Sequence, residues 1–354
     1  MDTKSYTNDA VRLLKELIAI PSVSRNETLA ADKLASYLDL WQLPYGREGN
    51  NLWVGCQDWD NNRKTVMLNA HIDTVRPVST WSRDPFTPSQ EGDLLYGLGA
   101  NDCGGGLVSL LQVYRIMLHQ PRDYNILWVA SAEEEVSGED GFSRVLPLLP
   151  PVDVAIIGEP TGMQPAIAEK GLMVIDGYVY GKSGHAARNE GVNAIYEALD
   201  DLVWLRDYSF RKVSPLLGAT KLTVTVIESG TQHNVVPDLL HFVIDVRTNE
   251  FYQNEFVFEF LRKKMKHCKL QARSFRLHSS GIAEDHPLVR RCVDRGMKPF
   301  GSPTLSDQAL MPFPSLKLGP GESSRSHAAD EFIRISEIQQ AIDTYVSLLA
   351  GLTL

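Results

Sequence analysis

The chain has 354 residues, of which 43% are hydrophobic and 22% are charged, a composition typical of globular proteins with one large or two medium domains. Its formal net charge of -9 argues against nucleic acid or an anionic membrane as the main partner. The chain does not start with the pattern of a signal peptide, and no apolar run approaches the ~18 residues that suggest a membrane span. We therefore expect a cytoplasmic protein that binds neither nucleic acid nor membrane.

The four cysteines are scattered along the chain without CxxC spacing, at Cys56, Cys103, Cys268 and Cys292. This spacing favours free thiols in a reducing compartment over a disulfide framework. Neither an internal repeat nor a low-complexity linker interrupts the chain.

Helix and strand patterns alternate through residues 1–165. An amphipathic helix covers residues 7–20 and stops before Pro21. Further elements in this part are a helix over 104–120 and buried strands over 64–75, 124–135 and 152–161. Such alternation favours an α/β fold with helices on both faces of a sheet.

The pattern changes near Lys170. The following elements are strands over 172–187, 220–229, 238–248 and 269–277, with helices over 193–208 and 253–267. This βαββαβ order predicts a ferredoxin-like α+β domain over residues 171–279. The first pattern then returns, with helices over 286–296 and 336–351 and a strand over 315–321. We therefore predict a discontinuous domain, formed by residues 1–170 and 280–354, whose mixed sheet is flanked by helices.

Chemically active side chains follow the strands of the first domain. They are His71, Asp73, Asp102, Glu134, Glu135 and Glu159, with His327 after a Gly-Pro-Gly turn near the end of the chain. Open α/β sheets carry their sites at such strand ends. Singly, each residue has a structural alternative, because acidic residues after strands often cap turns or helices. A dinucleotide loop in "GLGANDCGGG" is disfavoured, because Asp102 stands where the third glycine of GxGxxG is needed.

Taken together, the two histidines and several carboxylates form a ligand set suited to zinc, cobalt or manganese. Two divalent cations would neutralise three carboxylates and a bridging hydroxide, and would so offset the repulsion within the cluster. They would also lower the pKa of a bridging water towards neutral pH. The sequence therefore predicts a two-metal hydrolytic centre.

The chain resembles a known group of metallohydrolases over nearly its whole length. This group contains acetylornithine deacetylase, succinyl-diaminopimelate desuccinylase, carboxypeptidase G and aminoacylase. The motifs that carry the resemblance are, in order, "HIDTV", "GLGANDCGGG", "SAEEEVSGEDG", "IIGEPT", "GKSGHAA", "HNVVPD", "DVR" and "LGPGESSRSHAADE". The resemblance implies a zinc-exopeptidase-like catalytic domain, with residues 171–279 as a lid and dimerisation domain.

The resemblance also implies roles for the residues of the metal centre. One zinc ion would bind His71 and Glu159, the other would bind Glu135 and His327, and Asp102 would bridge them, with Co²⁺ or Mn²⁺ as substitutes. Asp73 would orient His71, and Glu134 would be the general base. Glu133 would be supporting or exposed, and the Asp102–Cys103 peptide would be cis.

For the lid, the resemblance implies that His185 hydrogen-bonds the oxyanion of the intermediate, typically in the partner subunit. Asn234 and Arg247 would contact the substrate, and Gly321 would line the pocket. From the residues alone, His185 fits a glycine-rich turn equally well, and Arg247 fits a pair with Asp245 or Glu250. His233 has no assigned role.

One motif departs from the family. Where relatives have Asp-Met-Lys-Gly, this chain has Asp102, Cys103, Gly104 and Gly105. The missing lysine leaves the local pairing open, and Cys103 is either redox-sensitive or, as we favour, a small buried residue.

We expect an enzyme that removes an acetyl or succinyl group from the nitrogen of an amino acid such as acetylornithine or an acylated citrulline, in arginine biosynthesis. A succinyl-diaminopimelate desuccinylase and a metallo-carboxypeptidase or dipeptidase are alternatives, because they perform the same amide chemistry. A metal-binding scaffold without activity is a third reading, which the base Glu134 disfavours. A homodimer through residues 171–279 is expected by analogy, although some relatives are monomers.

Overall fold

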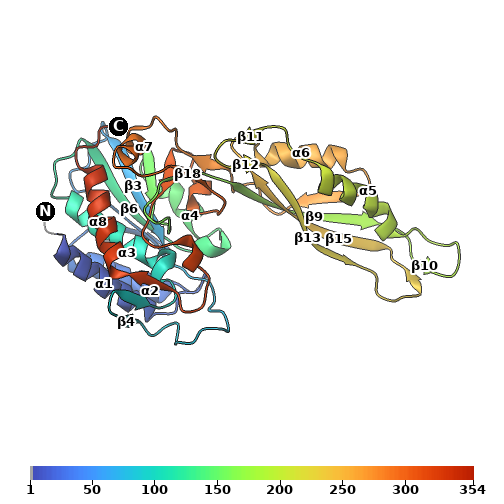
Figure 1. Cartoon of the computed structure of the whole chain (residues 1–354), viewed down its shortest axis with the longest axis horizontal. Helices are drawn as coiled ribbons and strands as arrows, with labels where there is room; N and C mark the ends of the chain where they lie inside the picture. Colours follow the sequence, from blue (N-terminus) through green and yellow to red (C-terminus); the bar gives the residue numbers. More distant parts are fainter. Residues whose placement is uncertain (1–2) are drawn as a thin grey trace. The chain divides into compact units, whose positions relative to one another are not determined.

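The computed structural model describes residues 3–354, and the chain divides into two compact units (Figure 1). Unit 1 consists of Met1–Ile167, Gly281–Phe300 and Ser306–Leu354. Unit 2 consists of Ala168–Ser280 and Gly301–Leu305. One continuous segment thus supplies nearly all of unit 2, whereas unit 1 is assembled from both ends of the chain.

The main sheet has nine strands in the order β1-β2-β6-β3-β7-β19-β8-β17, with β18 also beside β8. Their bounds are β1 (Gly46–Glu48), β2 (Asn51–Gly55), β3 (Lys64–His71), β6 (Tyr124–Ser131), β7 (Val154–Ile157), β8 (Ala166–Glu169), β17 (Ser280–Gly281), β18 (Phe300–Ser302) and β19 (Ser315–Lys317). The central strands β6, β3, β7 and β19 run parallel, whereas β1, β2 and β8 pair antiparallel with their neighbours. The expected mixed sheet is therefore confirmed.

Helices cover both faces of this sheet. The helices of unit 1 are α1 (Lys4–Ile18), α2 (Thr28–Leu40), α3 (Gly105–Met117), α4 (Phe142–Val145), α7 (Pro287–Val293) and α8 (Ile335–Leu349). Helix α3 packs on β3 and β6 with α1 and α8 beside it, and on another part of the sheet Phe142 and Val145 of α4 pack with Met67 and Val129. The sequence patterns do not reveal α2, because alanines on its buried side give it little amphipathic contrast.

The parallel pairing brings three strand ends to one edge of the sheet. His71 at the end of β3 pairs with Ser131 at the end of β6, and Asn69 pairs with Ile157 at the end of β7. The segments that follow these strands therefore leave from the same edge, where open α/β sheets carry their sites.

A second small sheet, in the order β20-β5-β4, supports the loop before α3. Its strands are β4 (Ser89–Glu91), β5 (Leu94–Tyr96) and β20 (Phe332–Arg334).

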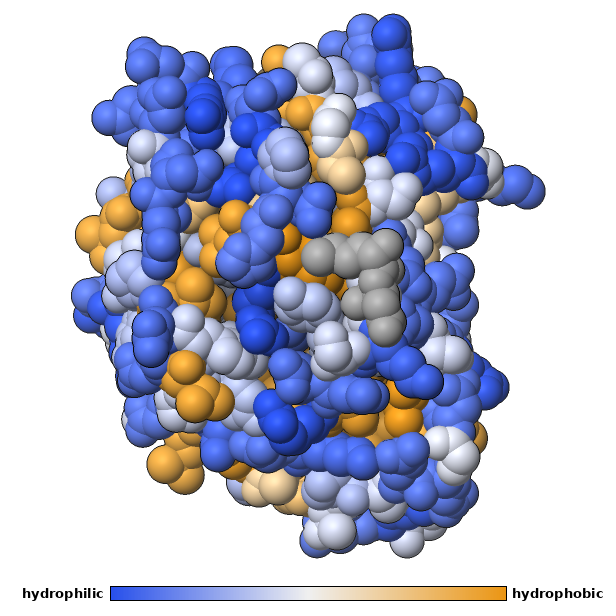
Figure 2. Space-filling view, turned by 90° about the vertical axis from the view of Figure 1, so that its left-hand side faces the viewer, coloured by the Kyte–Doolittle hydropathy of each residue, from blue (hydrophilic) through white to orange (hydrophobic). Residues whose placement is uncertain are grey.

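Figure 2 shows one side of the molecule, on which hydrophilic side chains predominate and apolar ones are scattered among them. Within residues 3–354, no helix has both the length and the apolar character needed to cross a bilayer.

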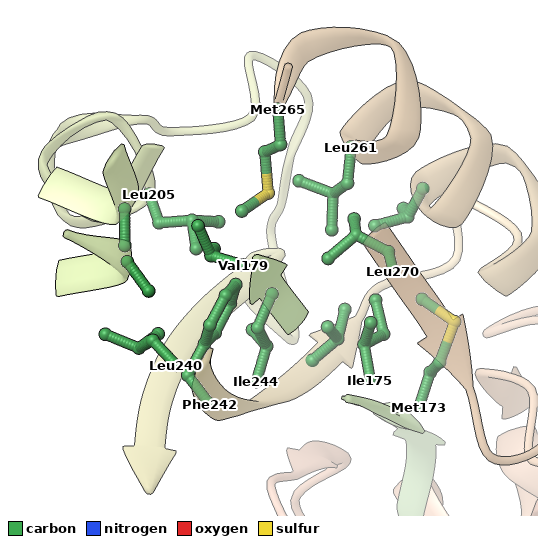
Figure 3. Close-up of a cluster of buried hydrophobic side chains, with 14 of the residues drawn as sticks. Met173, Ile175, Val179, Leu205, Leu240, Phe242, Ile244, Leu261, Met265 and Leu270 are labelled. Atoms are coloured by element: carbon green, nitrogen blue, oxygen red, sulfur yellow. The ribbon is translucent and has the colours of Figure 1, made fainter. Parts of the chain in front are cut away.

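Unit 2 has the expected ferredoxin-like element order. Its main elements are β9 (Gly171–Tyr180), α5 (Ala194–Asp207), β13 (Lys221–Ser229), β15 (Leu239–Thr248), α6 (Asn254–Lys264) and β16 (Lys269–Ala272). The antiparallel sheet has the order β13-β15-β9-β16, and α5 and α6 lie on one face of it (Figure 1). Figure 3 shows its core, in which Ile175 and Val179 of β9 and Leu240, Phe242 and Ile244 of β15 point towards the helices.

Two strands of unit 2 are shorter than their sequence patterns predict. Strand β9 ends at Tyr180, and the chain resumes extended pairing only as β10 (Gly184–His185) beside β14 (Val235–Val236). Strand β16 ends at Ala272. At Gly181 a Cβ atom would lie 2.1 Å from the carbonyl oxygen of Val192, so the chain turns where only glycine fits.

Candidate active site

The two histidines and three carboxylates predicted as metal ligands meet at the carboxyl edge of the main sheet. The Nε2 atom of His71 lies 3.3 Å from Oδ1 of Asp102 and 3.5 Å from Oε1 of Glu159. The Nε2 atom of His327 lies 3.5 Å from Oδ2 of Asp102 and 2.9 Å from Oε2 of Glu135. Asp102 thus presents one carboxylate oxygen to each histidine, between two half-sites that each contain one further glutamate.

Glycines hold Asp102 in place ahead of helix α3. A Cβ atom on Gly106 would lie 1.8 Å from the carbonyl oxygen of Gly158, so this close approach joins the Asp102 loop to the end of β7. A Cβ atom on Gly104 would lie 2.3 Å from the carbonyl oxygen of Gly99. The lysine of the family pattern therefore has no room at Gly104 in this backbone. The Asp102–Cys103 peptide is cis, which confirms the expectation.

His71 is oriented for metal binding through Nε2. Its Nδ1–H donates to the carbonyl oxygen of Asp73 at 2.9 Å, while the nearer carboxylate oxygen of Asp73 is 3.4 Å away. Because a carbonyl oxygen can only accept, Nδ1 carries the proton and the lone pair of neutral Nε2 faces the cluster. The expected orienting role of Asp73 is thus mainly performed by its backbone.

The carboxylate of Asp73 holds the loop that follows β6. Its Oδ1 accepts the backbone N–H of Glu134 at 3.0 Å, and its Oδ2 accepts that of Glu135 at 3.1 Å and the hydroxyl of Ser24 at 2.7 Å. Burial alone would raise the pKa of Asp73, but the hydrogen bond from His71 and these donors hold it below its usual value.

A left-handed turn lets two adjacent glutamates enter one site. Glu133 has φ 54°, and the short 3₁₀ turn Glu134–Val136 follows it. Oε2 of Glu134 lies 4.0 Å from Nε2 of His71. Glu133 is buried, with its N–H donating to Glu27, so it is a supporting residue.

The side chains fit a pair of bound cations. Burial and the neighbouring Asp102 raise the pKa of Glu159 to about 8, and burial with nearby carboxylates raises the pKa of Glu134 well above its usual value. The hydrogen bond to Glu135 raises the pKa of His327 to about 9. Oε1 of Glu159 is buried without a hydrogen-bond partner. Gathered carboxylates and an unsatisfied oxygen are the features that divalent cations neutralise.

Cys103 is also close to this cluster. Ligand atoms of His71, Cys103 and Glu159 lie within 4.8 Å of one another, as do those of His71, Asp102 and Glu135. The Cys103 thiol donates to the carbonyl oxygen of His71 at 3.5 Å and is buried, and burial raises its pKa. A buried protonated thiol agrees with the filler role rather than with a reactive one. All four cysteines are free thiols, as predicted.

Comparisons with known proteins identify the family of the chain. The model of the peptidase family M20/M25/M40 matches residues 67–351. The chain belongs to this family. It is therefore a hydrolase that acts on amide bonds. Acetylornithine deacetylase of Proteus mirabilis is 27% identical, with 93% of each chain covered. A Mycobacterium tuberculosis protein provisionally named succinyl-diaminopimelate desuccinylase is 27% identical, with 97% of this chain and 98% of that protein covered.

Solved structures of the M20 family share the fold. Aminopeptidase PepT of Bacillus cereus has a TM-score of 0.78 at 18% identity, with 97% of this chain and 98% of that chain covered. YXEP of Bacillus subtilis, described as a dinuclear metal binding peptidase from the M20 family, has a TM-score of 0.75 at 15% identity, with 98% of each chain covered. At this identity the likeness concerns the fold alone.

Sequence reasoning missed one residue of the site, Glu331. The residue is 2% exposed, and its carboxylate accepts the backbone N–H groups of Gly99, Asn101 and Asp102 at 3.1, 2.7 and 2.9 Å. Burial raises its pKa to about 7. Its one sequence signal is its position four residues after His327. The amino-acid pattern does not indicate that its carboxylate accepts backbone N–H groups of the segment around Asp102.

The other predicted site residues lie as follows. In unit 1, Gly321 has φ 80°, and a Cβ atom there would lie 2.1 Å from Oδ1 of Asn101, the residue before Asp102. In unit 2, His185 is exposed on β10, and the N–H of Ala186 donates to the carbonyl oxygen of Asn234 at 3.0 Å.

Arg247 lies on strand β15, also in unit 2. Its Nε donates to Oδ1 of Asp245 at 2.9 Å and its Nη2 donates to Oδ2 at 3.1 Å. The structure thus realises the pair with Asp245, one of the two partners that the sequence left open. His233 is exposed and its role stays unassigned.

Proposed function

We propose that the chain removes an N-acyl group, acetyl or succinyl, from an amino acid with the help of two divalent cations. The observation that carries this proposal is Asp102, whose two carboxylate oxygens face His71 and His327 separately. A carboxylate that coordinates a single cation would not require a histidine beside each of its two oxygens. The neighbouring Glu134 supplies the base that such a hydrolysis requires.

His71, Asp102 and Glu159 would hold one cation, and Asp102, Glu135 and His327 would hold the other. By ligand type these cations would be Zn²⁺, with Co²⁺ or Mn²⁺ as substitutes. When bound, the cations would supply Lewis acidity for the amide carbonyl and for a water molecule. The YXEP protein, described as dinuclear, supports this assignment.

Within the chain, Glu134 would move the protons of the reaction. Its Oε2 would take a proton from the attacking water and give it to the leaving amine. The anchor of its backbone N–H on Asp73 keeps it at the cluster. By resemblance to the family, His185 would donate a hydrogen bond to the oxyanion, and Asn234 and Arg247 would contact the substrate. Gly321 would line the pocket, where the absence of a side chain leaves room beside Asn101.

The names of the relatives support an N-acyl amino acid as substrate. We propose that the reaction belongs to arginine biosynthesis in the cytoplasm. A succinyl-diaminopimelate desuccinylase is the nearest alternative, and a peptidase is the second, because aminopeptidase PepT shares the fold.

The test is a hydrolysis screen of the zinc-reconstituted protein against acetyl and succinyl derivatives of ornithine, citrulline and diaminopimelate, with di- and tripeptides beside them. Release of acetate or succinate from an acylated amino acid, faster than peptide cleavage, is the expected result. Cleavage of peptides alone would replace the proposal by the peptidase alternative.

Unit 2 would also form the homodimer interface. Strand β13 is an edge strand of its sheet and exposes Val226 and Ile227. On the neighbouring helix α5, Tyr196, Leu199 and Val203 are exposed at helical spacing. An unpaired strand edge beside an apolar helix stripe is a surface that a second copy can cover by continuing the sheet.

A further inference from the structure

A buried asparagine lies beside the shared carboxylate of unit 1. Asn101 immediately precedes Asp102 in the chain and is fully buried. A buried side-chain amide is retained where its donors and its acceptor find partners, because an unpaired one destabilises the fold. The partners of this amide therefore show which part of the chain it holds.

The side-chain amide of Asn101 binds the segment that leads to His327. Its Oδ1 accepts the backbone N–H of Glu322 at 3.1 Å, and its Nδ2 donates to the carbonyl oxygen of the same residue at 3.1 Å. Nδ2 also donates to Oγ of Ser326, the residue before His327, at 3.2 Å. The amide thus holds the segment from Glu322 to Ser326 at both of its ends.

This segment is irregular and mostly exposed. It contains one short 3₁₀ turn, Ser323–Arg325, and both Glu322 and His327 are exposed. His327 has φ 60°, a left-handed conformation that costs free energy for a residue other than glycine. Its imidazole is therefore placed by hydrogen bonds to neighbouring segments and not by burial in a core.

The chain after His327 returns to the same asparagine. The carboxylate of Glu331 accepts the backbone N–H of Asn101 at 2.7 Å and that of Asp102 at 2.9 Å. Residues 322–331 thus form a loop that is closed on Asn101, through the side-chain amide before His327 and through the backbone N–H after it. Asp102 and His327, which are far apart in the sequence, therefore share one support.

We infer that Asn101 is a positioning residue, whose side chain holds His327 beside Asp102 and so completes the second cation site. This inference rests on the two cations of the proposed function. The ligands His71 and Glu159 of the other cation follow strands β3 and β7 of the main sheet, so their positions do not depend on the amide of Asn101. Loss of this amide should therefore affect the two cations unequally.

The first test measures cation binding without catalysis. Calorimetric titration of the metal-free full chain with Zn²⁺ should give two binding events in wild type. In Asn101→Ala the affinity of one event should fall about tenfold to hundredfold, the usual effect of losing a support of a metal ligand, while the other stays. Equal affinities in wild type and Asn101→Ala would overturn the inference.

The matched control for this titration is Asn125→Ala. Asn125 is also a buried asparagine, and its amide pairs with the backbone N–H and the carbonyl oxygen of a single residue, Asp60, at 3.0 and 2.8 Å. It lies near the start of β6, whereas the cluster lies beyond the end of this strand. Asn125→Ala should therefore leave both binding events unchanged, even where it lowers the stability of the fold.

The second test changes the partner of the amide. Ser326→Ala removes the hydroxyl that accepts from Asn101 and should weaken the same binding event, whereas Ser326→Thr keeps a hydroxyl and should restore its affinity. With two equivalents of Co²⁺ in place of Zn²⁺, ions that share the Asp102 carboxylate couple magnetically, which electron paramagnetic resonance detects. The coupling should be lost in Asn101→Ala and in Ser326→Ala. Coupling of wild-type strength in both variants would contradict the inference.

A readout without metal separates this inference from the proposed function. Hydrogen exchange of the metal-free protein over residues 322–331 should be faster in Asn101→Ala than in wild type and unchanged in Asn125→Ala. If wild type binds fewer than two cations, the proposed function fails, and this exchange alone decides whether Asn101 holds His327. Equal exchange in wild type and Asn101→Ala would then remove Asn101 from the positioning role.

Discussion

Glu331 accepts the backbone N–H of Asp102 at 2.9 Å, and so fixes the peptide that carries the shared carboxylate. In Glu331→Gln, an amide N–H would face the backbone N–H of Gly99 or of Asn101 and Asp102. We expect zinc affinity to fall about tenfold to hundredfold, the usual effect of losing a support of a metal ligand. Competition with a chromogenic chelator measures it, with the exposed Glu284→Gln as control. Unchanged zinc affinity would show that Glu331 does not position Asp102.

Glu134→Gln should separate binding from catalysis. The substitution keeps the size of the side chain but removes the proton acceptor, so kcat should fall about 10²-fold to 10⁴-fold. Both cations should stay bound, because Glu134 is not among the five proposed ligands. Metal analysis and steady-state kinetics on the same preparation check this. A variant that retains metal and wild-type turnover would remove Glu134 from the role of base.

Metal removal should make stability depend on pH in a defined direction. In the metal-free chain the folded-state pKa of Glu159 is about 8 and that of His327 about 9, both above their ordinary values. The folded state then holds more protons than the unfolded state between about pH 5 and 9, so its stability falls as the pH rises through this window. Urea unfolding of chelator-treated protein should show a loss on the order of a few kcal/mol, mainly from Glu159, because water screens the interactions of the exposed His327.

The zinc-loaded protein is the control for this measurement, because cations in place of protons should flatten the same profile. If the free energy of unfolding of the metal-free protein rose between pH 5 and 9, the carboxyl groups of the cluster could not be protonated in the folded state as assigned.

The lowered pKa of Asp176 in unit 2 predicts that stability depends on pH in the opposite direction at low pH. Hydrogen bonds from Arg273 and then from His241 lower its pKa to about 2, against the effect of burial. A carboxyl group with a lowered pKa stabilises the fold above its unfolded value and loses this contribution as the pH falls from about 4 to 2. Asp176→Asn should therefore remove on the order of 1–2 kcal/mol of stability at pH 7 and flatten the acid limb. The exposed Asp200 on helix α5, changed to Asn, is the control and should leave the acid limb as it is.

The proposed dimer can be tested on the edge strand β13. Ile227→Lys places a charge on the exposed edge and should convert a dimer into a monomer in light scattering. Val293→Lys, at an exposed apolar position in unit 1, is the matched control and should leave the mass unchanged. A wild-type chain that is monomeric at all concentrations would exclude the proposed interface.

Much of the candidate site could be inferred from the sequence because its residues follow strands. His71 and Glu159 come after apolar runs with clear boundaries, and parallel strands bring their ends to one edge. The turn at Glu133 and the support by Glu331 could not be inferred in this way. Both depend on backbone groups of distant segments, and a backbone N–H has no signature in the amino-acid pattern.

The sequence by itself determined the class of fold and the kind of chemistry, because hydrophobic periodicity and ligand type are local properties of the chain. Only the tertiary structure decided that Asp102 turns one oxygen to each histidine and that the carbonyl of Asp73 sets the tautomer of His71. These relationships depend on strand register and on turns, and residues far apart in the chain acquire a common geometry only when the sheets form.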